Sequence, residues 1–238
     1  MFKSSKLLKL ALIFGLTTTP VMAHQVLTED LGSNKYEVKF WAHDGYQAYQ
    51  PEQLIQVKGY DEALNEVRTG IRYNRGTEKA PEVLTEKTAA LMVSVYDAGY
   101  WVDSNAGFVV GDKIEAEGIV FGAISSIKMG KTYYEWNEKM LAPLGLKYEV
   151  IALSDVTKLK KGDYLSVLVL KDGKPASGVA FENNTDSLSE ETNEFGIAYL
   201  PVNFDGLNIL ASTFEEPLFN DPKAETLFIQ SSISFWVK

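Results

Sequence analysis

The chain contains two histidines, His24 and His43, and their positions suggest a metal site. If processing removes everything up to Ala23, His24 becomes the amino-terminal residue and offers its α-amine and its imidazole Nδ1 to one cation. The imidazole of His43 can then complete a three-nitrogen site. Such a site needs neutral imidazoles and a deprotonated amine, so we expect its affinity to fall as the pH drops through the histidine pKa.

The available ligands narrow the choice of metal. The sequence has no cysteine, so any metal must be held by nitrogen and oxygen. Three nitrogens suit Cu²⁺, Ni²⁺ and Co²⁺, and Zn²⁺ is also compatible. The competing interpretation is a frayed terminus at His24 and a hydrogen-bonded strand-end residue at His43, because two ligands in a sequence need not meet in space.

Acidic residues near aromatic stretches are further candidate ligands. The stretch Phe40 to Tyr46 predicts a strand that ends in a turn, where Asp44 could orient an imidazole or ligate the ion. A solvated turn residue is the alternative, since Asp-Gly pairs are common in turns. Asp97 and Asp103 are conceivable outer ligands, but strand packing with a turn at Gly99 explains their stretch more simply.

The first 23 residues have the features of a secretory signal. Lys3, Lys6 and Lys9 form a cationic start, residues 10–16 form an apolar run, and small residues lead to Ala23. The apolar run is shorter than the roughly 20 residues that span a bilayer. We therefore expect residues 1–23 to be a cleaved signal peptide, the mature protein to be periplasmic, and no stable membrane insertion.

Charge and missing motifs exclude several classes of function. Loss of the three leader lysines would change the formal net charge from −9 to −12, and such an acidic chain repels nucleic acid and anionic membranes. The sequence has no Gly-x-Ser-x-Gly elbow, phosphate-binding glycine loop or His-Glu-x-x-His motif. With two histidines, the chain has few candidates for the general base of a hydrolytic triad. We expect no nucleic-acid partner and no enzymatic activity.

Short runs rich in valine, isoleucine, tyrosine and phenylalanine recur between glycine, asparagine and aspartate turns, which predicts an all-β fold. Residues 131–141 are compatible with either a helical face or a strand and loop. The expected strands are residues 36–42, 54–59, 89–96, 107–110, 123–129, 147–152, 164–170, 178–182, 196–202, 207–213 and 226–237.

The strand pattern divides the mature chain into two β-sandwich modules. Residues 24–145 form the first, which carries the candidate metal site, and residues 146–238 form a transthyretin-like or immunoglobulin-like sandwich. The step Pro143-Leu144-Gly145 is the expected boundary, because regular strand spacing begins there. Asp172-Gly173 and Asp205-Gly206 are the expected turns of the second module.

In these features the chain resembles the DUF4198 family, which is related to periplasmic components found beside nickel and cobalt uptake transporters. The resemblance rests on Ala23-His24, on residues 41–46, and on the order of residues 146–153, 159–163, 172–175 and 192–196. Two departures are visible: residues 25–27 lack the usual aromatic, and Ala42 and Asp44 flank His43 where glycines are usual. Neither departure removes a candidate ligand.

The resemblance implies a periplasmic binding protein that takes up a divalent transition metal, with nickel or cobalt favoured, and delivers it to an inner-membrane uptake transporter. His24 would supply an amine and an imidazole, and His43 a second imidazole. One alternative is a copper histidine-brace redox enzyme with an axial tyrosine, which uses the same three nitrogens. The other is a metal-free β-sandwich interaction protein.

Overall fold

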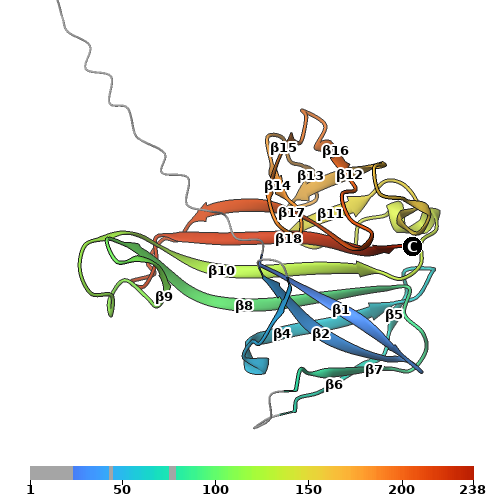
Figure 1. Ribbon diagram of the computed structural model, residues 1–238, viewed down its shortest axis with the longest axis horizontal. Coiled ribbons are helices and arrows are strands. Elements are labelled where there is room, and N and C mark those ends of the chain that lie inside the picture. The colour runs from blue at the N-terminus through green and yellow to red at the C-terminus, as the bar shows by residue number, and fades with distance from the viewer. Residues whose placement is uncertain (1–23, 43–44, 75–78) are drawn as a thin grey trace, which may run out of the picture.

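The computed structural model describes residues 24–42, 45–74 and 79–238. It confirms the all-β prediction, because strands in three sheets account for the regular structure apart from short 3₁₀ helices. The sheets stack in sandwich-like layers around a long central sheet (Figure 1). The 3₁₀ helices are η1 (Pro51–Gln53), η2 (Glu138–Leu141) and η3 (Val156–Lys158).

The large sheet runs through the whole molecule in the order β15-β14-β17-β18-β10-β8-β4-β5, with β9 also paired to β8. Its strands come from both halves of the sequence. They are β4 (Leu54–Tyr60), β5 (Glu66–Val67), β8 (Leu91–Ser104), β9 (Gly107–Val110), β10 (Val120–Tyr133), β14 (Ala180–Glu182), β15 (Ser187–Glu191), β17 (Gly206–Pro217) and β18 (Thr226–Val237).

Two smaller sheets cover the large one. The N-terminal sheet has the order β1-β2-β7-β6, with β3 paired to β2. It contains β1 (His24–Gly32), β2 (Lys35–Ala42), β3 (Gly45–Gln47), β6 (Thr69–Arg72) and β7 (Glu82–Thr85). In the C-terminal sheet, β12 pairs with β11, β13 and β16; its strands are β11 (Tyr148–Ala152), β12 (Tyr164–Lys171), β13 (Lys174–Pro175) and β16 (Ile197–Pro201).

The alternation of buried and exposed side chains along the strands explains why the sheets stack in layers. In β12 the inward residues Leu165, Val167 and Val169 are fully buried, while Tyr164 is 63% exposed. They join a core shared by the C-terminal sheet and the β17–β18 side of the large sheet. A second core lies between the N-terminal sheet and strands β4 and β8, and it includes Val26.

Most predicted strands are present, with differences at two places. Residues 91–104 form one continuous strand, β8, that runs through the turn expected at Gly99, because an irregularity in its pairing with β10 lets the strand bend there. Gly99 has a φ of +73° at this bend. The ambiguous stretch 131–141 divides into the end of β10 and the short η2 helix.

One parallel pairing joins the two halves of the chain. β10, from the first half, pairs with β18, from the second half, over Ile124 to Thr132 and Thr226 to Ser234. The other pairings in the large sheet are antiparallel among the described strands. The division into modules 24–145 and 146–238 stays a prediction, and the sheet is continuous across the proposed boundary.

Strand β1 crosses the face of the large sheet at very short range, as Figure 1 shows for the blue strand over β8 and β10. A Cβ atom at Gly130 of β10 would lie 1.9 Å from the carbonyl oxygen of Val26. Beside this crossing, the amide of Thr28 donates to Thr132 Oγ1 at 3.0 Å, and Tyr134 Oη donates to Thr28 Oγ1 at 2.8 Å. Glycine is therefore required at position 130 for β1 to dock.

We predict that Gly130→Ala destabilises the protein by about 1–3 kcal/mol, because the new methyl group overlaps backbone that cannot move independently. Urea unfolding followed by circular dichroism would measure the change. Gly70→Ala is the matched control, since its Cβ would meet nothing closer than the Leu84 carbonyl at 4.0 Å. Equal stability of the two variants would contradict the proposed close crossing.

Candidate functional site

His24 is the first residue of β1, and strand pairing fixes its place. Its partner in the antiparallel ladder is Ala42, the last residue of β2. The side chain is half-buried. Its imidazole lies 5.8 Å from the ring of Phe40 and 6.1 Å from the ring of Trp101, measured between centroids. A rigid sheet therefore presents this histidine at the edge of an aromatic cluster.

The other two predicted ligands, His43 and Asp44, lie outside the described residues. Their neighbours in the sequence are described, because Ala42 precedes them and Gly45 follows them, and these two residues pair with each other. Ala42 pairs with His24 as well. The residue that directly precedes His43 in the chain is therefore the ladder partner of His24.

The described residues do not assemble a complete metal site by themselves. Within 24–42, 45–74 and 79–238, no group of three or more histidine, aspartate or glutamate side chains is arranged to hold an ion. Asp97, a conceivable outer ligand, instead accepts a hydrogen bond from the amide of Gly99 at 2.9 Å. This bond agrees with a turn at Gly99, the simpler interpretation of this stretch. Asp103 pairs across the ladder with Phe108.

The aromatic cluster beside His24 continues into β8. Phe40 contacts Tyr96 at 5.1 Å between centroids, and Tyr49 contacts Tyr96 at 5.4 Å. Tyr96 Oη donates to Gln53 Oε1 at 2.8 Å, and burial raises the pKa of this phenol to about 12. Tyr49 Oη donates to the Val38 carbonyl at 3.0 Å. These phenols are protonated at neutral pH and engaged with protein acceptors.

On its opposite side, β1 is anchored by a buried polar cluster that the sequence analysis missed. Gln25, fully buried, donates from Nε2 to Glu182 Oε1 of β14 at 2.7 Å. Gln230 of β18 also donates to Glu182, and Lys128 of β10 donates to Gln230. All four side chains are at most 5% exposed. The sequence signal was weak, because Lys128 is one of two lysines in β10 and Glu182 is the last residue of the short strand β14.

Two acceptor atoms of the cluster have no partner in the described part of the chain. Gln25 Oε1 and Glu182 Oε2 are buried and have no hydrogen-bond partner among the described residues. Burial lowers the pKa of Lys128 and raises that of Glu182, and each shift is opposed by the charge of the other residue. The cluster therefore joins β1 to three strands of the large sheet at the position next to His24.

Comparison with known proteins identifies the chain only to the level of its family. A model described as a domain of unknown function, DUF4198, matches residues 9–216. The chain belongs to the DUF4198 family. A Haemophilus influenzae relative, described as an uncharacterized protein, is 25% identical over 215 residues, which is 90% of each chain. No solved structure matches this DUF4198 protein.

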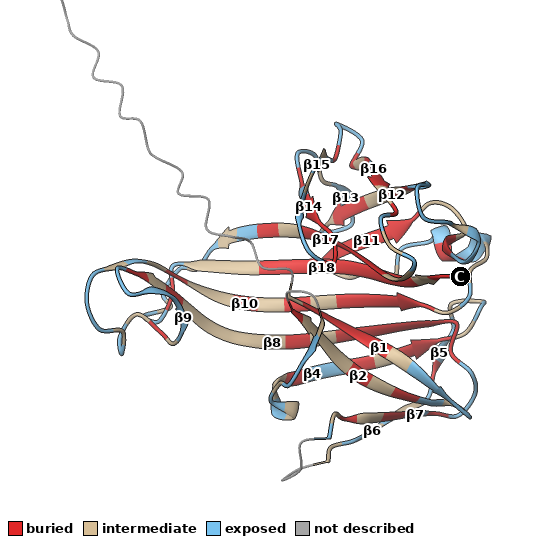
Figure 2. Cartoon of the chain, viewed as in Figure 1, coloured by how far each residue is buried: buried red, intermediate tan, exposed pale blue. Residues whose placement is uncertain are grey.

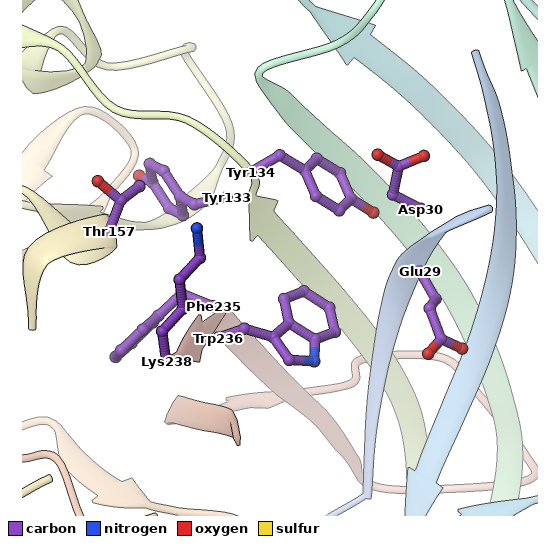
Figure 3. A pocket seen from close by; sticks show the side chains of 8 residues that line it. All are labelled: Glu29, Asp30, Tyr133, Tyr134, Thr157, Phe235, Trp236 and Lys238. Carbon is purple, nitrogen blue, oxygen red and sulfur yellow. The ribbon is translucent and has the colours of Figure 1, made fainter. Parts of the chain in front are cut away.

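A cavity of about 320 Å³ lies at the other end of β1 from His24. Figure 3 shows its walls: Tyr134 and Trp236 on one side, Asp30 and Glu29 from β1, and the Lys238 ammonium near Tyr133. The Tyr134 and Trp236 rings are stacked, 6.1 Å between centroids and 11° from parallel. No local sequence pattern predicts this cavity, because its lining comes from four separate segments.

Among the described residues, no helix is long and apolar enough to cross a membrane.

We predict that Glu182→Gln destabilises this DUF4198 protein by about 3–5 kcal/mol, because it leaves the Lys128 ammonium buried without a counter-charge. Urea unfolding would measure the loss. Glu191→Gln is the matched control on neighbouring β15, where the side chain is exposed, and it should be nearly neutral.

A double variant tests whether the two charges act as a pair. Adding Lys128→Met to Glu182→Gln removes both charges, so most of the stability should return. A double variant as unstable as the sum of the single variants would show that Lys128 and Glu182 do not stabilise one another.

Proposed function

We propose that this DUF4198 protein is a periplasmic carrier that binds one divalent transition-metal ion, nickel or cobalt, and delivers it to an inner-membrane uptake transporter. The ligands are the α-amine and imidazole of His24, exposed by cleavage after Ala23, and the imidazole of His43. Asp44 is an additional oxygen ligand or orients an imidazole. The observation that carries the proposal is the pairing of His24 with Ala42, the residue before His43.

Covalent connection limits how far apart the ligands can be. Adjacent strands lie about 4.7–4.9 Å apart, so His24 is one strand spacing from Ala42, the residue to which His43 is covalently bonded. The described residues thus support the sequence-based ligand set, although they contribute only His24 to it.

The setting of His24 suits an ion that is carried rather than used in a reaction. β1 is held by the Gly130 crossing and by the buried cluster at Gln25, so the terminal residue begins at a fixed position. The His24 side chain itself is only half-buried, which leaves room for ligand exchange with an acceptor. Within the described part of the chain, the rings of Phe40 and Trp101 lie beside it, and neither carries a phenol.

Native mass spectrometry of the exported protein, titrated with Ni²⁺, Co²⁺ and Cu²⁺, tests the proposal. We expect a chain that starts at His24 and retains one ion. One additional alanine before His24 should weaken binding strongly, since it moves the amine out of the chelate ring, and His43→Ala should weaken it as well. Gln47→Ala, an exposed change on β3, is the control and should bind as the parent does.

Each result of this titration has a defined meaning. A different starting residue, or no retained ion, would overturn the carrier proposal. A copper-loaded protein that produces peroxide with ascorbate would replace the carrier with a redox enzyme. Binding that is indifferent to the added alanine would place the metal elsewhere on the chain.

Trp101 provides a second test, because its ring lies 6.1 Å from the His24 imidazole. Cu²⁺ bound at His24 should quench the fluorescence of this indole at short range. The chain has four tryptophans, and Trp41 also lies near His24 because it pairs with Gln25, so Trp101→Phe should remove more of the quenching than Trp236→Phe does. Trp236→Phe is the control, since Trp236 lies at the cavity at the far end of β1. Equal loss of quenching in both variants would argue against a copper site at His24.

A further inference from the structure

A long arm projects from one end of the large sheet. It consists of the end of β8, strand β9, the loop 111–119, the start of β10 and the loop 218–225. Figure 1 shows it extending beyond the region where the smaller sheets cover the large one, and Figure 2 shows exposed residues at its tip.

The arm has internal structure of its own. Val102, Ala123 and Ala224 form a small buried cluster inside it. Glu225 Oε1 accepts the amide of Ala123 at 2.9 Å, which ties the loop 218–225 to β10. The Asp112 carboxylate accepts the amide of Ile114 at 3.0 Å and turns the loop that follows β9. The surface of the arm is therefore presented by a defined backbone.

That surface is unusually apolar. Within 14 residues of the sequence, six large apolar side chains are between 45% and 72% exposed: Phe108, Val109, Val110, Ile114, Ile119 and Phe121. Phe219, in the neighbouring loop, is 82% exposed. Monomeric proteins seldom expose apolar residues in such density, and contiguous patches of this kind commonly mark interaction surfaces.

Strand β9 adds an open sheet edge to this surface. It pairs with β8 through Trp101–Val110 and Ser104–Gly107. Among the described residues, no strand pairs with its outer edge. The sequence of β9, Gly-Phe-Val-Val, contains no proline and no charge. Natural edge strands normally carry a proline or a charged residue that prevents further pairing. An edge without them is suited to pairing with another strand.

We propose that the arm is a homodimer interface in which the β9 edges of two copies pair antiparallel about a twofold axis. An isologous contact of this kind needs a self-complementary surface, and β9 offers apolar side chains on both faces. The exposed area of the seven apolar residues is on the order of 800 Å², which is what each partner buries in a standard protein interface.

The charges on the arm oppose binding to an anionic membrane. Lys113 pairs with Glu225 at 2.9 Å, and Lys223 pairs with Asp112 at 3.1 Å, so both of these cations are neutralised within the arm. Glu115 and Glu117 remain exposed at its surface. These carboxylates repel an anionic bilayer. In a dimer they produce mild repulsion that salt screens, so dimerisation should strengthen as the ionic strength rises.

The two faces of β9 have different neighbours. Val109 is opposite the buried residue Val102. Phe108 and Val110 share a face with Trp101, against which the Phe108 ring stacks at 5.4 Å and 14°. Because Trp101 also contacts His24, the dimer would carry its two His24 residues on faces next to the interface. The dimer proposal does not depend on metal binding at those residues.

Sedimentation velocity of the metal-free protein over a range of concentrations, at low and high salt, tests this proposal. We expect a dimer that is tighter at high salt. Val109→Lys should raise the dimer dissociation constant by at least about tenfold, since it places two like charges at the strand edge. Leu31→Lys is the matched control, because Leu31 is 52% exposed on β1, away from the arm, and should leave the dimer unchanged.

Cysteine cross-linking locates the interface. The chain has no native cysteine, so Phe108→Cys, Val109→Cys and Val110→Cys can be oxidised one at a time without background. At least one of the three should give a covalent dimer, and Leu31→Cys should not.

Several outcomes would overturn the proposal. A protein that stays monomeric at all concentrations and salt levels has no such dimer, and flotation of that monomer with phosphatidylcholine vesicles would identify a lipid surface as the occupant. A dimer that survives Val109→Lys and shows no β9 cross-link uses a different surface. Thermal unfolding of Val109→Lys separates loss of the dimer from loss of the fold.

Discussion

The contact between the Val26 carbonyl and Gly130 determines how the first strand meets the rest of the protein. With no side chain at position 130, β1 lies directly on β10, and its backbone and side chains bond to Thr132 and Tyr134. Both faces of the strand are then buried, Val26 in the core under the N-terminal sheet and Gln25 against the large sheet. The position of His24 follows from this docking.

Burying the polar cluster around Glu182 costs desolvation free energy that apolar residues in the same places would not cost. Two opposite charges removed from water stabilise a fold little in net terms, and a pair left half-complete destabilises it. Here the cluster links β1, β10, β14 and β18, which come from both halves of the chain. The cluster therefore fixes how the two halves of the chain pack together. Its contact with β1 is Gln25, the residue that follows His24.

The two ends of the large sheet differ in how far the smaller sheets cover them. Over its middle and one end, the smaller sheets pack against the large sheet and form the two main cores with it. The arm extends past this cover with only a small core of its own, yet it carries a dense set of exposed apolar residues. An uncovered extension with an open strand edge is costly in a monomer, since it invites association. In the proposed dimer that surface is buried.

The sequence by itself determined the all-β class, most strands of the large and C-terminal sheets, and the turns at Asp172-Gly173 and Asp205-Gly206, because alternation and turn chemistry are local properties. It also singled out His24. Local patterns did not show that β8 is continuous through Gly99, that β10 and β18 pair in parallel, or that Gln25 meets Glu182 across 157 positions. The tertiary structure decided these features, because each depends on which distant strands become neighbours. The same applies to the Trp101 ring beside His24 and to the open edge of β9: neither has a signature within its own segment of the chain.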